Sequence, residues 1–178
     1  LLPFIILQKN NLTQLNFKKN SNIFFYLVVV GFMLSFGNSL QQLALLYTDV
    51  ANTAVFTVFY VVLVPMVAYY FYSKNIHWSV WPSALFCLIG GFLLTDLNSA
   101  NVRIGDSIAV LNAFLWAFHI VFISKLIKIY NYPVIVAGLQ CLIGSFFALI
   151  PALIFETVLI SNILLETKEL LYAGVLSS

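Results

Sequence analysis

Five long apolar stretches follow one another along the chain, and short polar segments separate them. They cover residues 23–47, 50–72, 78–97, 104–126 and 133–155. Each contains about 20 residues or more, the length that an α-helix needs to cross a hydrocarbon core of about 30 Å. The pattern therefore predicts five complete membrane spans and an all-α polytopic membrane protein.

The charged residues sort by side when these stretches are threaded back and forth through a membrane. One side receives six lysines and no acid, namely Lys9, Lys18, Lys19, Lys74, Lys125 and Lys128. The other receives Arg103, Lys168 and all six acids, namely Asp49, Asp96, Asp106, Glu156, Glu166 and Glu169. Because cytoplasmic loops retain Lys and Arg, the segments 8–22, 73–77 and 128–132 are predicted to face the cytoplasm. The segments 48–49, 98–106 and 156–169 are predicted to face outward.

The composition agrees with a membrane protein and excludes several other classes. The chain is 62% hydrophobic and 8% charged, whereas about 25% of the residues in a soluble domain are charged. The lysines lie in separate short loops and form no continuous basic face, so we expect no nucleic-acid partner. Cys87 and Cys141 lie inside predicted spans, where a free cysteine is usually a small buried apolar side chain. No Cys/His cluster has metal-ligand spacing, and we expect no metal or other cofactor.

Neutral polar residues inside the spans are the candidates for a solute pathway, because polar groups at membrane depth need partners or water. The first span carries four such residues at positions i, i+3, i+4 and i+7 of one helical face, with Gln41 beside them. They are Ser35, Asn38, Ser39 and Gln42. Hydrogen bonds that hold the bundle together are one interpretation of this face. A lining for a solute cavity is the other.

The second span carries Thr53, Thr57 and Tyr60 on one face, followed by Pro65. Proline has no backbone N–H, so it leaves the carbonyl of Val61 without its helical partner and is expected to bend the helix. Two interpretations of this bend stay open. It has a purely structural role, or it forms part of a gate at mid-membrane.

The fourth span presents Asn112, Trp116 and His119 on one face. A lone histidine is more often a satisfied core residue than a proton carrier, and a tryptophan often only fills space. Facing a water-filled cavity, the same indole, imidazole and amide groups would suit a small polar or aromatic solute.

Two stretches resemble the EamA-type members of the drug/metabolite transporter superfamily. GNSLQQLALLYTDVANTAVFTVFYVVLVPMVAYYF, residues 37–71, is similar to the third and fourth helices of that family. It contains an A-L-x-Y-T-like phrase at 44–48, a tight turn and then a central proline, Pro65. GDSIAVLNAFLWAFHIVF, residues 105–122, resembles the sixth helix. The charged residue, typically Glu, that often follows the fourth helix is absent, and Lys74 and Asn75 stand there instead.

The resemblance implies two inverted five-helix repeats. Residues 1–97 would hold the end of the first repeat, a partial helix and three spans. Residues 104–178 would hold the start of the second, two spans and a partial helix. The chain would thus run from the tail of helix two to the start of helix eight, with a substrate site near the midplane.

A member of this family would be a multi-pass inner-membrane secondary transporter and not an enzyme. It would export a small metabolite or drug-like solute by alternating access, with the solute and the lipid bilayer as partners and a homodimer as one form of assembly. Pro65 would supply the bend of a gate. The residues expected to line the solute pathway are Asn38, Gln41, Gln42, Tyr60, Trp116 and His119.

Two other classes stay open. A membrane-embedded enzyme would need a cluster of carboxylate, His or Cys side chains at one depth. A scaffold or sensor that transports nothing would not need polar faces turned toward a common cavity. Solute flux in vesicles separates transport from both.

Overall fold

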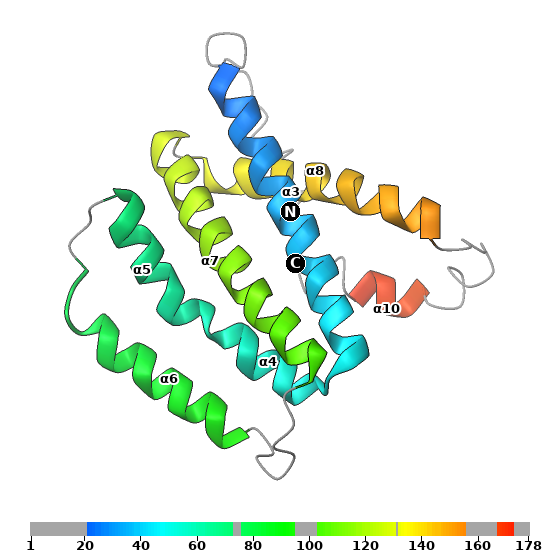
Figure 1. Ribbon diagram of the computed structural model, residues 1–178. Helices are drawn as coiled ribbons and strands as arrows, with labels where there is room; N and C mark the ends of the chain where they lie inside the picture. Colours follow the sequence, from blue (N-terminus) through cyan, green and yellow to red (C-terminus); the bar gives the residue numbers. More distant parts are fainter. Residues whose placement is uncertain (1–20, 73–75, 95–102, 131, 156–166, 173–178) are drawn as a thin grey trace.

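The computed structural model describes residues 21–72, 76–94, 103–130, 132–155 and 167–172, and all regular structure in these ranges is helical (Figure 1). The helices are α3 (Ser21–Tyr47), α4 (Val50–Val58), α5 (Tyr60–Tyr72), α6 (Val80–Leu94), α7 (Ile104–Tyr130), α8 (Pro133–Phe155) and α10 (Thr167–Leu171). Four stretches are long and apolar enough to cross a membrane: Asn22–Tyr47, Val50–Phe71, Ile104–Ile129 and Pro133–Ile154. The all-α prediction is confirmed for the described residues, and the four stretches suggest a membrane protein.

The helix boundaries follow the apolar stretches to within two residues, with three larger differences. α7 ends at Tyr130 rather than at residue 126. The stretch 50–72 forms two helices, α4 and α5, which meet at Phe59. α6 starts at Val80 and has 15 described residues, about 22 Å at 1.5 Å per residue. The last part of that predicted span, 95–97, lies outside the described residues. The same holds for residues 8–20, 73–75, 98–102 and 156–166, which are parts of the predicted loop segments 8–22, 73–77, 98–106 and 156–169.

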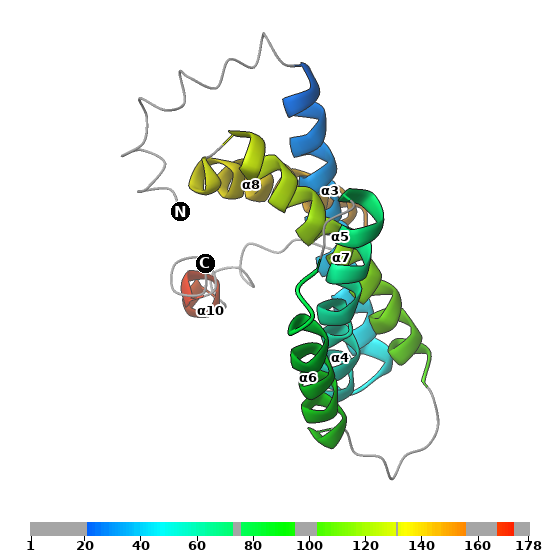
Figure 2. The same ribbon diagram turned by 90° about the vertical axis from the view of Figure 1, so that its left-hand side faces the viewer.

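Helix α7 is at the centre of the packing and contacts α3, α4, α5 and α8. α6 lies at the edge of the molecule against α4 and α5 (Figure 1). Figure 2 shows α8 leaving the layer formed by α3, α4, α5, α6 and α7, so that it crosses α3 instead of running beside it. A core of Ile23, Leu27, Leu126 and Val136 joins α3, α7 and α8 near the start of α3.

Two glycines permit the close crossing of α3 and α8. A Cβ on Gly31 would lie 2.7 Å from Cγ2 of Ile143 and 3.2 Å from the carbonyl oxygen of Gln140. A Cβ on Gly144 would lie 3.2 Å from the carbonyl oxygen of Gly31. Small residues let the backbones of membrane helices approach each other in this way. The two helices diverge beyond this contact, and the space between them forms the candidate site.

Candidate functional site

The groove between α3 and α8 has a volume of about 830 Å³. Its polar residues come mainly from α3 and its small residues from α8. The lining consists of Leu34, Ser35, Asn38, Ser39, Gln42, Leu43, Leu46, Cys141, Gly144, Ser145, Ala148, Pro151 and Ala152. All four residues predicted to share a face of the first span therefore line one groove. None of the described residues that line it is charged.

Three exposed polar side chains of α3 in the groove have no hydrogen-bond partner among the described residues. Within the part of the chain that the structure describes, no group hydrogen-bonds the side chain of Asn38, Ser39 or Gln42. Ser145 differs, because its hydroxyl donates to the carbonyl of Leu142 in its own helix at 2.8 Å. Polar groups at membrane depth without partners are costly. Asn38, Ser39 and Gln42 are therefore the groups in this groove that are available to water or a solute.

The expectation that both cysteines are buried is wrong. Cys87 and Cys141 are free thiols and both are exposed. Cys141 lines the groove, whereas Cys87 lies on α6, at the edge of the molecule. The error arose because apolar sequence alone does not distinguish a helix face that packs on protein from one that faces lipid or a groove.

The polar face of α7 is turned toward α3 and α8. Asn112 is fully buried at 0% exposure. With its amide oriented to satisfy both neighbours, its nitrogen donates to the carbonyl of Gly37 at 3.0 Å and its oxygen accepts from Nε1 of Trp116 at 3.2 Å. The amide thus links the α3 backbone to the indole, and this favours a structural role for Asn112.

His119 continues this polar face one turn further along α7. Its ring packs edge-on against that of Trp116, with 5.4 Å between centroids. Its Nε2 lies 3.3 Å from Oε1 of Gln140 on α8. The other ring nitrogen, Nδ1, is buried and has no hydrogen-bond partner among the described residues. His119 therefore has one satisfied and one unsatisfied nitrogen at the junction of α7 and α8.

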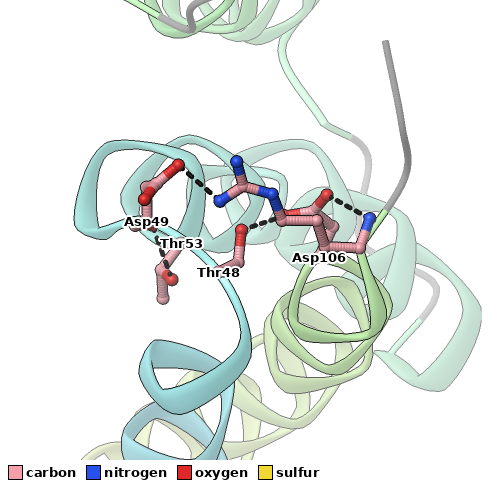
Figure 3. Close-up of polar contacts among 5 residues, drawn as sticks. Thr48, Asp49, Thr53 and Asp106 are labelled. Carbon is pink, nitrogen blue, oxygen red and sulfur yellow. Dashed lines mark hydrogen bonds and ion pairs between the residues drawn. The ribbon is translucent and has the colours of Figure 1, made fainter. Parts of the chain in front are cut away.

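A second polar cluster joins the turn between α3 and α4 to the start of α7 (Figure 3). The hydroxyl of Thr48 donates to Oδ1 of Asp106 at 2.6 Å in a buried position. Oδ2 of Asp106 accepts the backbone N–H of Arg103 at 2.9 Å, which is half of a capping box at the start of α7. The guanidinium of Arg103 pairs with Asp49 at 2.6 Å.

Gly105 completes this junction. A Cβ at this position would lie 2.6 Å from the carbonyl oxygen of Ala44 and 2.8 Å from the backbone nitrogen of Thr48. Only glycine allows the first turn of α7 to approach the end of α3 this closely. Residues 44–48 and the first turn of α7, which lie within the two stretches 37–71 and 105–122 that resemble the EamA family, are thus in direct contact.

The polar face of the second span is satisfied mainly within its own helix. The hydroxyl of Thr53 donates to the carbonyl of Asp49 at 3.1 Å, and that of Thr57 donates to the carbonyl of Thr53 at 2.7 Å. Tyr60, the first residue of α5, is half-buried. The hydroxyls of Thr53 and Thr57 therefore bind the backbone one turn earlier.

The interruption of the second span lies at Phe59 rather than at the proline. Phe59 donates its N–H to Phe56 and accepts the N–H groups of Val62 and Leu63. α5 continues through Pro65, which is buried. Pro65 therefore lies inside regular helix, about one and a half turns after the tight turn at Phe59.

The predicted pathway residues fall into separate surroundings. Asn38 and Gln42 line the groove, and Trp116 and His119 pack together on α7. Gln41 is half-buried, and its register between Gly37 and Ala44 places it on the α7 side of α3. Trp116 is not among the residues that line the groove. That Gln42 and Trp116 contact one solute stays a prediction.

No protein-family model, no curated protein and no solved structure matches the chain.

Proposed function

We propose that this protein is an EamA-type secondary transporter that exports a small metabolite or drug-like solute by alternating access. The groove between α3 and α8 would be part of its solute pathway. The observation that carries the proposal is the set of three exposed polar side chains without described partners, Asn38, Ser39 and Gln42, along one wall of this groove.

The size and the lining of the groove support a small-molecule site. Its volume of about 830 Å³ lies within the range of about 300–1,000 Å³ that is common for ligand pockets. Its walls are mostly apolar and carry a few amide and hydroxyl groups, the usual composition of such sites. Since the described lining residues carry no charge, an uncharged solute with hydrogen-bonding groups suits the groove best.

The native cysteines supply a direct test of water access. In a Cys87→Ser variant, Cys141 is the remaining thiol, and it lines the groove. A water-soluble maleimide should label it in membranes, because a thiol must meet water to ionise and react. The matched Cys141→Ser variant retains Cys87 on α6 and should label slowly. If Cys141 labels no faster than Cys87, lipid or protein fills the groove and the bundle-packing interpretation is preferred.

Flux in reconstituted vesicles tests transport itself. A panel of radiolabelled nucleosides and neutral sugars is the appropriate set of probes for an uncharged polar groove. A transported probe should also slow the labelling of Cys141. Gln42→Leu should reduce its flux, because the substitution removes a hydrogen-bonding group with little change in volume. Absence of protein-dependent flux for every probe would contradict the choice of solute class.

A further inference from the structure

A second cleft lies between α5 and α7, which pack side by side (Figure 1). Its volume is about 340 Å³. Most of its wall is aliphatic, with Val64 and Ala68 on α5 facing Ile120 and Val121 on α7. These side chains give the cleft a surface suited to a hydrocarbon chain.

Polar and basic groups gather at one end of this cleft. Ser124, Lys125 and Lys128 lie on the last turns of α7 and complete the lining together with Ile129. Nζ of Lys125 also makes a cation–π contact, 5.6 Å from the centroid of the Tyr26 ring on α3. No acidic side chain is among the described residues that line the cleft.

We propose that this cleft binds an anionic phospholipid. The phosphate would lie between the ammonium groups of Lys125 and Lys128 and accept a hydrogen bond from the hydroxyl of Ser124. One acyl chain would follow Ala68, Val64 and Ile120 toward the membrane interior. Basic clefts between helices at the cytoplasmic edge of a membrane recognise anionic headgroups in this way.

The apolar wall decides between a lipid and a free phosphate ion. A free ion would be held by the lysines and the hydroxyl alone and would leave the aliphatic wall without a partner. A lipid matches both ends of the cleft. The long stems of the two lysines also allow their ammonium groups to reach the interface while α7 stays in the membrane.

Titration of the detergent-solubilised protein with dioleoyl phosphatidylglycerol, followed by native mass spectrometry, tests the basic end. Lys125→Gln and Lys128→Gln should each weaken binding about fivefold, and the double variant about 25-fold. Lys128→Arg keeps the charge and should bind like the unaltered protein. Lys168→Gln on α10 removes the same charge outside the cleft and serves as the matched control. Equal affinity for phosphatidylcholine, or an equal loss with Lys168→Gln, would overturn the proposal.

Filling the cleft tests the apolar end. Ala68→Phe should reduce phosphatidylglycerol binding at least fivefold without a change in charge. The control Ala54→Phe adds the same ring at an exposed position on α4 and should leave binding unchanged. Inorganic phosphate at millimolar concentration should not displace the lipid. If Ala68→Phe binds normally, or if inorganic phosphate competes at the lipid's own concentration, the cleft is not a lipid site.

Discussion

Thr48 and Asp106 are 58 positions apart in the sequence, and their side-chain oxygens are 2.6 Å apart in the structure. The contact is buried and joins the end of α3 to the first turn of α7. The remaining carboxylate oxygen of Asp106 accepts the backbone N–H of Arg103. One carboxylate thus connects the turn that follows α3 with the start of the central helix.

Removal of the Thr48 hydroxyl should destabilise the protein. Thr48→Val keeps the shape of the side chain but leaves a buried carboxylate oxygen without its donor, at a cost of about 1–3 kcal/mol. The free energy of unfolding, measured by detergent denaturation and circular dichroism, reports the loss. Asp49→Asn breaks only the exposed Arg103–Asp49 pair, whose side chains are 39% and 66% exposed, and should cost less than about 1 kcal/mol. Equal losses of unfolding free energy in the two variants would show that the buried Thr48–Asp106 hydrogen bond stabilises the protein no more than the exposed Arg103–Asp49 pair.

Gly105→Ala should cost about 1–3 kcal/mol, because the added methyl group would overlap backbone atoms of Ala44 and Thr48 that cannot move aside easily. Gly90→Ala is the matched control within another helix. A Cβ at Gly90 would have no described atom within 4 Å, so alanine should be neutral or stabilise α6 by up to about 1 kcal/mol. Gly105→Ala should therefore lower the unfolding midpoint, whereas Gly90→Ala should raise it or leave it unchanged.

The charge sorting predicts which ends of the helices face the cytoplasm. In a background without Cys87 and Cys141, Val50→Cys should react with a membrane-impermeant maleimide in intact cells. Ser79→Cys, beside the predicted cytoplasmic segment 73–77, should react only after permeabilisation. Both positions are exposed, so a lack of labelling would not come from burial in the protein. The reverse pattern would invert the topology.

Pro65→Ala should leave stability unchanged or increase it, because alanine restores a hydrogen-bond donor to the carbonyl of Val61 and proline inside a helix costs about 3 kcal/mol. If α5 takes part in a gate, the substitution should also slow solute flux in vesicles. Pro82→Ala in the first turn of α6, where proline is well tolerated, is the control and should change neither quantity. Normal flux with Pro65→Ala would make the proline a passive element of the helix.

A solute that reaches both Gln42 and Trp116 should couple the two residues. Gln42→Leu and Trp116→Ala would then have non-additive effects on solute affinity, whereas effects at independent sites add within about 0.3–0.5 kcal/mol. Trp116→Phe separates stacking from the hydrogen bond to Asn112, since it keeps an aromatic ring without the indole N–H. Plain additivity would assign Gln42 to the groove and Trp116 to the packing of α7 against α3.

The helices follow from the sequence more completely than the contacts between them. The apolar runs 23–47 and 133–155 predict α3 and α8 nearly residue by residue, because the charged and polar residues around them end the runs sharply. The interruption at Phe59 could not be seen, since an apolar residue without a glycine or proline beside it continues the helical pattern. The bend expected at Pro65 stays a prediction, since α5 continues through that residue.

The candidate site was predicted in part. Helical spacing placed Asn38, Ser39 and Gln42 on one face, and this face lines the groove. The partner of His119 could not be derived, because Gln140 is 21 positions away on a helix that crosses the bundle. Charge sorting assigned Asp49, Arg103 and Asp106 to one side of the membrane but gave no reason to pair Thr48 with Asp106. Such pairing depends on the approach at Gly105, which only the three-dimensional structure reveals.

The close contact between Gly31 and Gly144 sets where α3 and α8 cross, so the width of the groove near Gln42 depends on their crossing angle. Gln42 lies about 16 Å along α3 from this point at 1.5 Å per residue, so a rotation of only about 10° between the helices moves it about 3 Å relative to α8. A small difference in crossing angle therefore changes the width of the groove near Gln42 much more than it changes the separation of the helices at Gly31 and Gly144. A bulkier residue at Gly31, which is not among the residues that line the groove, would therefore change the width of the groove near Gln42 from a distance.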